Sequence, residues 1–297
     1  MPLNVIGILN VNIGLDEYVI NEHLKLVSRD FFEKNDISMS PDIRFYKTFI
    51  VGTYEFGTDL NSISNESKAF FPIYLLWAMR LYLNEINLEN SSWFSGESYE
   101  NLKEYIKVSN GTPANIASLL QNWADFKIDN ITKDIDLKAL ENIIIIFEKI
   151  QKLYISTEES AEQLNLHWMY ALTKYNEVFS DIEPTAAVTS ITSALEFLLV
   201  NTSNESDYRA ALFAALLSCE KLEDRKFNFD LLRWTFNVRD KLSGSLVPDL
   251  IMDKCQLPEN LLKLKEILGK VLLFTIDLSP LELQEKLDNI ILSAPIN

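Results

Sequence analysis

Histidine and cysteine are scarce in this chain of 297 residues, which holds two of each. The cysteines, Cys219 and Cys255, form no CxxC motif and no Cys/His cluster, so no zinc site is expected. The sequence also lacks a G-x-G-x-x-G stretch, a Walker A loop and an H-E-x-x-H motif. We therefore expect neither a cofactor nor a metal.

Long apolar runs without charge are missing too. A membrane-spanning helix needs about 18 or more such residues in a row, and no segment reaches this length. The opening residues, MPLNVIGILNVNIG, lack the basic stretch and the small-residue cleavage site of a signal peptide. These absences predict a cytoplasmic protein with no membrane contact.

Positive charge is in deficit, with 27 Lys and Arg against 43 Asp and Glu and a net charge of −16. A chain of this charge repels a phosphate backbone unless it gathers its few cations into one patch. Any contact with RNA would therefore have to be local.

The first half of the chain predicts a mixed α/β region. Apolar and β-branched residues favour a strand over 3–13 and a strand or hairpin over 43–56, with Gly52 and Gly57 as breakers. The segment 16–34 fits an amphipathic helix that would carry His23 as a structural residue. Helices are also predicted at 73–86, 114–126 and 137–154, with a surface loop and a short helix over 87–107.

Helical patterns follow one another closely after a cap at Thr157. They predict helices at 161–179, 184–200, 208–219, 230–242, 259–275 and 280–291. The third is apolar and alanine-rich, and should be central in a bundle; the fourth should be capped by Asn228 or Asp230. We predict an α+β protein in which a mixed α/β sensing domain, 1–156, precedes an all-α domain, 157–297.

The stretch 190–199 contains Ala194-Leu195-Glu196, and the stretch 231–242 contains Arg239 followed by Asp240. In these features the two helices resemble the HEPN superfamily, especially its ApeA-like branch, and 190–199 resembles the ALE-x-LL helix of those domains. The stretch 231–242 resembles the helix that carries their signature, an arginine followed by a polar residue and, after four to six residues, a histidine. Arg239 and Asp240 match the first two positions. The histidine positions hold Gly244, Ser245 and Leu246 instead.

The resemblance implies an all-α fold and a homodimer through the HEPN-like domain. It also implies metal-independent RNA cleavage in prokaryotic antiphage defence or a toxin system, once a partner domain senses a phage or host protein. In that chemistry the arginine stabilises the charged transition state and the histidine moves protons. Arg239, Asp240 and Glu196 are the candidate catalytic residues, and the acid/base component is missing.

Each candidate also has an ordinary structural interpretation. Arg239 could complement the dipole of its helix, and Glu196 could be a surface residue. Asp240 is adjacent to Arg239 in sequence and is not expected to face it on a helix. His167 is expected to pack rather than to replace the missing histidine. An aromatic row is expected to lie in the core rather than to stack on bases, namely Trp168, Tyr170, Tyr175 and Phe179.

Three functions stay open at this point. The chain is a catalytically degenerate HEPN-like protein that acts through interaction or dimerisation, an active endoribonuclease with unusual acid/base groups, or an unrelated helical binding module. The first two require 184–200 and 230–242 to pack side by side, with Glu196 and Arg239 in one groove.

Overall fold

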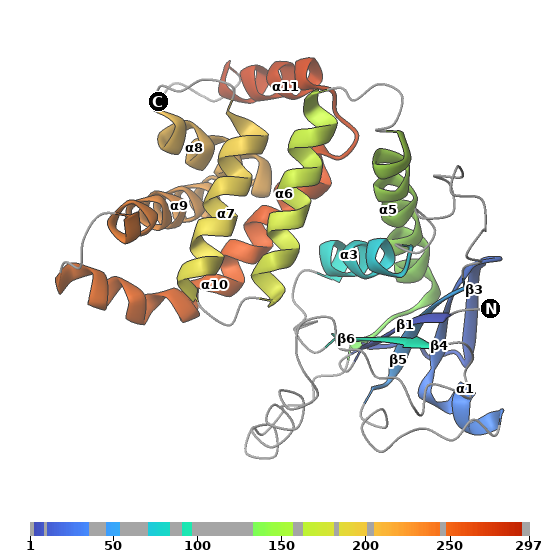
Figure 1. Cartoon of the computed structure of the whole chain (residues 1–297). Coiled ribbons are helices and arrows are strands. Elements are labelled where there is room, and N and C mark those ends of the chain that lie inside the picture. The colour runs from blue at the N-terminus through green and yellow to red at the C-terminus, as the bar shows by residue number, and fades with distance from the viewer. Residues whose placement is uncertain are drawn as a thin grey trace, which may run out of the picture. The chain divides into compact units, whose positions relative to one another are not determined.

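The structure is a computed structural model that describes residues 3–8, 11–35, 46–53, 71–83, 91–96, 133–156, 163–180, 184–200, 205–243 and 248–292. It contains two compact units (Figure 1). The first comprises Met1–Tyr82 and Ile86–Gln151, and the second comprises Leu83–Glu85 and Lys152–Asn297. A sheet in the first unit and a helical second unit confirm the α+β class predicted from the sequence.

Antiparallel pairing builds a five-stranded sheet in the first unit, in the order β3-β4-β5-β1-β6. The strands are β1 (Leu3–Ile8), β3 (Glu17–Asn21), β4 (Leu24–Ser28), β5 (Thr48–Thr53) and β6 (Ser91–Gly96). Two short strands, β2 (Val11–Asn12) and β7 (Lys133–Asp134), form a separate parallel pair.

The prediction of a helix over 16–34 is wrong. β3 and β4 form an antiparallel hairpin there, and only α1 (Arg29–Lys34) is helical. Leu24 and Leu26 are buried on either side of the less buried Lys25, which is the alternation of a strand. Pairing of β4 with β5 along its whole length outweighs the helical spacing. His23 lies in the hairpin turn, where its N–H donates to Asn21 Oδ1 at 2.9 Å.

Two further expectations for the first unit need correction. Gly52 does not break a strand; it lies inside β5 and pairs with Asn4 and Leu24. Ser91–Gly96 is not loop but the edge strand β6, held to β1 by backbone pairing that its serine-rich composition does not signal. Gly57 and the helix predicted at 114–126 lie outside the described residues.

Helices α3 (Phe71–Leu83) and α5 (Leu137–Ser156) confirm the patterns that predicted them. Leu75 and Met79 on α3 are fully buried, and the Phe71 ring meets Phe147 of α5 edge to face, with centroids 6.1 Å apart. The division between the two units falls inside α5, after Gln151.

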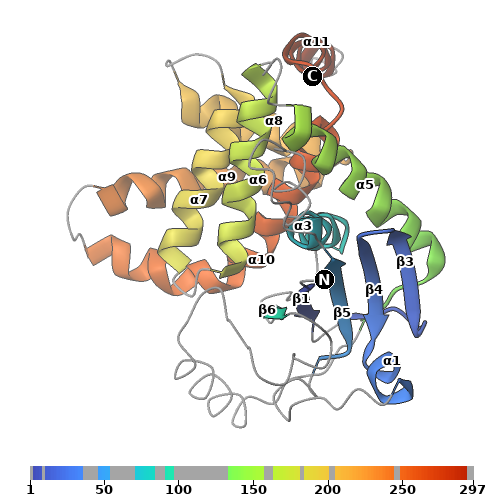
Figure 2. The ribbon, with the colours of Figure 1, turned by 45° about the vertical axis from the view of Figure 1, so that its right-hand side comes forward.

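The second unit is a helical bundle, as predicted (Figures 1 and 2). Its long helix α10 packs against four other helices of the bundle. Trp168 is buried, and its Nε1 donates to the backbone oxygen of Leu272 on α10 at 3.2 Å. The helices are α6 (Gln163–Ser180), α7 (Pro184–Leu199), α8 (Ser206–Ser218), α9 (Leu222–Ser243), α10 (Pro248–Thr275) and α11 (Pro280–Leu292).

Two helices in this unit, α9 and α10, begin well before the predicted residue. α9 begins at Leu222, so Asn228 is no cap; it is 2% exposed and donates to Ser218 Oγ at 2.9 Å, which joins the end of α8 to α9. α10 begins at Pro248 and continues through Pro258, immediately before the predicted start at 259. Burial of Leu257 against α7 and α9 favours continuing the helix despite the lost N–H of that proline.

In the described part of the chain, no helix has the length and hydropathy of a membrane span.

Candidate functional site

Arg239 of α9 lies at the centre of a group of polar side chains from three helices, which we call the ionic cluster: Glu196, Ser206, Asp207, Arg239 and Asp240. Its guanidinium donates through Nη1 to Glu196 Oε2, and through Nη2 to Asp207 Oδ1 at 3.0 Å. Ser206 Oγ lies 3.0 Å from Glu196 Oε1 and 3.1 Å from Asp207 Oδ1. One cation is therefore surrounded by three carboxylates.

Packing of the helices sets this geometry. On α7, the neighbours Ala194 and Leu195 are buried, which turns Glu196 toward the half-buried edge of the helix. On α9, Val238 is fully buried, and the Arg239 guanidinium carbon lies 5.0 Å from the Phe236 ring centroid. The structure thus brings 184–199 and 222–243 together, with Glu196 and Arg239 in direct contact.

Asp240 does face Arg239, contrary to the expectation. Arg239 Nε and Nη2 lie 3.2 and 3.1 Å from Asp240 Oδ1. Neighbouring Cβ atoms on a helix diverge, but the arginine side chain is long enough to fold back along the helix surface. Asp240 is also the most exposed of the three carboxylates, with 57% of its side chain exposed.

Asp207 and Ser206 are site residues that the sequence reasoning missed. They precede the helix predicted at 208–219, whereas in the structure they form the first turn of α8. A serine and an acid directly before an apolar run signal a helix start. That signal locates the helix but says nothing of the arginine 32 residues away with which Asp207 pairs.

Protonation in the ionic cluster is unevenly shared. Burial raises the pKa of Glu196, and its hydrogen bond with Asp207 raises it further, against the attraction of Arg239. Burial alone would raise the pKa of Asp207 as well, but its bond with Glu196 and the charge of Arg239 outweigh burial and lower it. Burial acts to lower the pKa of Arg239, but the charge of Glu196 and the hydrogen bond with Asp240 outweigh burial, so this pKa is raised. Of Glu196 and Asp207, Glu196 is therefore the one that takes up a proton first.

A second group, the aromatic patch, lies where α6 and the end of α7 meet: Leu166, His167, Tyr170 and Phe197. The ring centroid of Phe197 lies 4.4 Å from that of His167 and 4.6 Å from that of Tyr170. Burial lowers the pKa of His167. His167 packs against a ring in this arrangement, as expected.

The aromatic row divides between core and surface. Trp168 and Tyr175 are buried, which matches the expectation of core packing, whereas Tyr170 is 36% exposed. The side chain of Phe179 lies outside the described residues.

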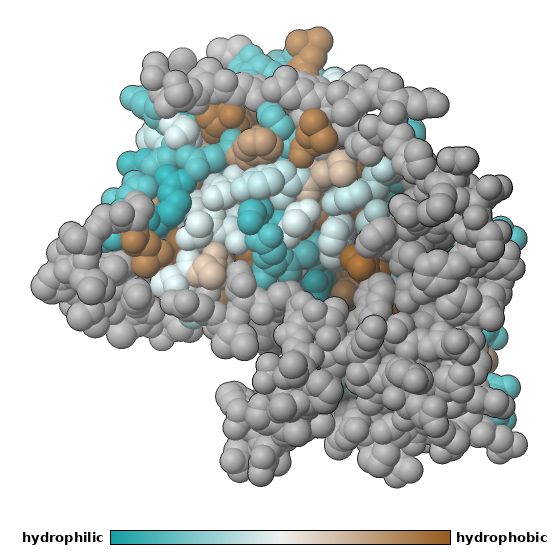
Figure 3. Space-filling view, in the orientation of Figure 1, coloured by the Kyte–Doolittle hydropathy of each residue, from teal (hydrophilic) through white to brown (hydrophobic). Residues whose placement is uncertain are grey.

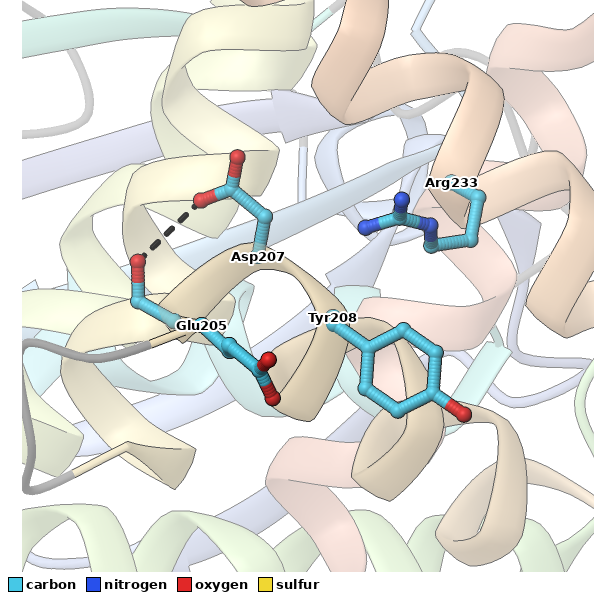
Figure 4. A pocket seen from close by; sticks show the side chains of 5 residues that line it. Glu205, Asp207, Tyr208 and Arg233 are labelled. Atoms are coloured by element: carbon cyan, nitrogen blue, oxygen red, sulfur yellow. Dashed lines mark hydrogen bonds between the residues drawn. The ribbon is translucent and has the colours of Figure 1, made fainter.

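A pocket of about 530 Å³ opens beside the ionic cluster (Figure 4). It is lined by Glu205, Ser206, Asp207, Tyr208 and Arg233. In Figure 4 the Arg233 guanidinium points toward the space between Asp207 and Tyr208, and its central carbon lies 5.4 Å from the Tyr208 ring centroid. The pocket combines the guanidinium of Arg233 with the carboxylates of Glu205 and Asp207, so charges of both signs line it.

Among the described residues, no three His, Cys, Asp or Glu side chains are grouped closely enough to hold a metal ion. Positions 244–246, which replace the histidine of the HEPN signature, lie outside the described residues.

Comparison of the chain with protein-family models, with curated proteins and with solved structures gave no match.

Proposed function

We propose that the helical unit is a catalytically degenerate HEPN-like module that acts by binding a partner. The observation that carries this proposal is the environment of Arg239. Its guanidinium donates to Glu196, Asp207 and Asp240 within its own chain. An arginine that stabilises a phosphate in a transition state needs those donors directed at the substrate.

The charge of the ionic cluster argues the same way. With all groups ionised, three carboxylates exceed one guanidinium, and the whole chain carries a net charge of −16. An RNA phosphate would have to displace a carboxylate from Arg239 and enter a negative field. The ionic cluster is thus better suited to hold α7, α8 and α9 together than to bind RNA.

The biological setting of the proposal comes from the resemblance alone. It implies a protein of prokaryotic antiphage defence or of a toxin system. In this proposal the first unit recognises a phage or host protein and the helical unit passes that signal to its own partner, for which the resemblance implies a second copy of the chain.

RNA cleavage tests the proposal. The purified full chain is incubated with tRNA and with total RNA, beside Arg239→Ala and Lys226→Ala. Lys226 is exposed on the same helix, so its replacement removes one positive charge without touching the ionic cluster. We expect no cleavage by any of the three proteins. Cleavage by wild type and Lys226→Ala but not by Arg239→Ala would refute a degenerate site.

One observation favours the alternative, an active metal-independent endoribonuclease. Glu196 contacts Arg239, and its raised pKa makes it a carboxyl group that can donate a proton nearer neutral pH than an ordinary glutamate. In that case Glu196→Gln abolishes cleavage while retaining the size of the side chain. The same RNA assay with this variant distinguishes the two functions.

A further inference from the structure

Three apolar or aromatic side chains of the aromatic patch are exposed to solvent. Leu166 is 50% exposed, Phe197 45% and Tyr170 36%. The Phe197 ring contacts both Tyr170 and His167, so the exposed surfaces of Phe197 and Tyr170 are continuous rather than scattered. Contiguous apolar surface bordered by charged side chains is typical of a contact with another protein.

Negative charge borders the aromatic patch. Glu196 immediately precedes Phe197 on α7 and brings the carboxylates of the ionic cluster next to the patch. Figure 3 shows hydrophobic surface toward the end of α7 and hydrophilic surface over α8 and α9 beside it. Glu196 and Phe197 also belong to the last turn of α7, where the helix dipole contributes partial negative charge. The carboxylates of the ionic cluster and the end of the helix dipole both make the potential here negative, which favours a positively charged occupant.

The chain itself already places a cation on this surface. Lys174 Nζ lies 5.7 Å from the Tyr170 ring centroid and 2.7 Å from Glu177 Oε2. A ring on one side and a carboxylate on the other thus hold an ammonium group. Phe197 is likewise exposed beside carboxylates, since it follows Glu196 in the sequence and Glu196 belongs to the ionic cluster, whose most exposed carboxylate is Asp240.

We propose that the aromatic patch docks a basic segment of a partner protein, with an arginine side chain stacked on Phe197 and its charge directed toward the ionic cluster. Arginine suits the surface better than lysine, because its planar guanidinium stacks on a ring and can donate to a carboxylate at the same time. The inference rests on the proposed function and adds to it a further partner, besides the second copy of the chain that the resemblance implies.

The negative charge beside the aromatic patch argues against two other occupants of the patch, a second copy of this chain and single-stranded RNA. A second copy of this chain would bring another net charge of −16 and, in a two-fold contact centred on α7, another ionic cluster. Single-stranded RNA offers bases for the rings but places phosphates beside the carboxylates. His167 does not offset this charge near neutral pH, because burial lowers its pKa.

Fluorescence anisotropy with three labelled ten-residue probes tests the proposal on the full chain: an Arg-Gly repeat peptide, a Glu-Gly repeat peptide and oligouridine. Phe197→Ala removes the stacking ring and Asp240→Asn removes the most exposed carboxylate of the ionic cluster. Phe227→Ala is the matched control, because Phe227 is 57% exposed on α9 and lies outside the patch.

We expect wild type and Phe227→Ala to bind the arginine peptide alike, and Phe197→Ala to bind it about 3- to 10-fold more weakly. Asp240→Asn should weaken it about 2- to 5-fold, with a difference that shrinks as salt rises. No binding of the arginine peptide, equal binding by Phe197→Ala and Phe227→Ala, or tighter binding of oligouridine would each overturn the proposal.

Sedimentation velocity tests whether a second copy of the chain occupies the aromatic patch. A wild-type dimer that Phe197→Ala converts to monomer, while Phe227→Ala stays dimeric, would assign the aromatic patch to a second copy and also overturn the inference. These outcomes are separate from RNA cleavage, so a failure here leaves the degenerate-site proposal standing.

Discussion

The guanidinium of Arg239 and the carboxylate of Glu196 meet across the contact between α9 and α7, 43 positions apart in the sequence. Arg239 retains 20% and Glu196 26% of their side-chain exposure, so the pair is largely but not fully withdrawn from water. Asp207 adds α8 to the same contact. One guanidinium therefore connects three helices of the bundle.

Replacing Arg239 by alanine should destabilise the helical unit. The change leaves the half-buried carboxylates of Glu196 and Asp207 next to each other without a counter-charge. We expect a loss of about 1–3 kcal/mol in the free energy of unfolding, less than for a fully buried pair because water still reaches the site. Urea unfolding measures it, and Arg239→Lys should recover part of the loss. The prediction fails if Arg239→Ala is as stable as Lys226→Ala.

Glu196 and Asp207 should respond oppositely to removal of their charges. The pKa of Glu196 is raised in the fold, so the fold loses stability as the pH rises from the pKa of the unfolded chain through the raised pKa, and ionisation opposes folding above that range. Glu196→Gln mimics the protonated form and should unfold at an equal or higher temperature than wild type at pH 7.

The pKa of Asp207 is lowered in the fold, so its ionised form stabilises the fold above the pKa of the unfolded chain. Asp207→Asn should therefore cost about 1 kcal/mol at pH 7, and the difference from wild type should disappear as the pH falls through the lowered pKa. Melting curves of both variants between about pH 7 and pH 3 test the pair. The same direction of change for both at pH 7 would contradict the assignment.

Gly7 of β1 should tolerate no larger side chain. A Cβ at this position would lie 2.7 Å from Cγ of Tyr46, a residue that is only 7% exposed. Gly7→Ala should cost about 1–3 kcal/mol through overpacking. Thermal unfolding measures the cost. Gly14 is a useful comparison: it has open space around it but φ of +64°, so Gly14→Asn should change stability by less than about 0.5 kcal/mol. Equal losses for the two variants would refute the steric explanation.

Trp168 should contribute to the stability of the bundle through both its volume and its indole N–H. The side chain is 2% exposed, and its Nε1 donates to the Leu272 backbone oxygen. Trp168→Phe loses that bond and leaves unfilled space, with an expected cost of about 1–3 kcal/mol. Leu166→Ala, on the same helix but 50% exposed, should cost less than about 0.5 kcal/mol. Similar denaturation midpoints for the two variants would contradict this prediction.

The sequence predicted the helical unit well because its apolar residues repeat with the period of a helix, and such a pattern depends on nearby residues alone. It wrongly predicted a helix where β3 and β4 form a hairpin, because Leu24 and Leu26 become strand residues only through pairing with β5. The contact of Glu196 with Arg239 was anticipated only through the family resemblance. Asp207 was missed because its pairing depends on where α8 begins relative to α9, which no local pattern encodes.

The parallel pair of β2 and β7 has a consequence for synthesis. Asn12 Nδ2 donates to Asp134 Oδ1, and the two residues are 122 positions apart. The ribosome therefore releases β2 long before it synthesises β7. Until then, the backbone groups of β2 that pair with β7 must bond to water or to other parts of the nascent chain. Closure of so distant a pairing is slow compared with helix formation. Maturation of the first unit thus has to wait until translation has passed Asp134, immediately before α5 emerges.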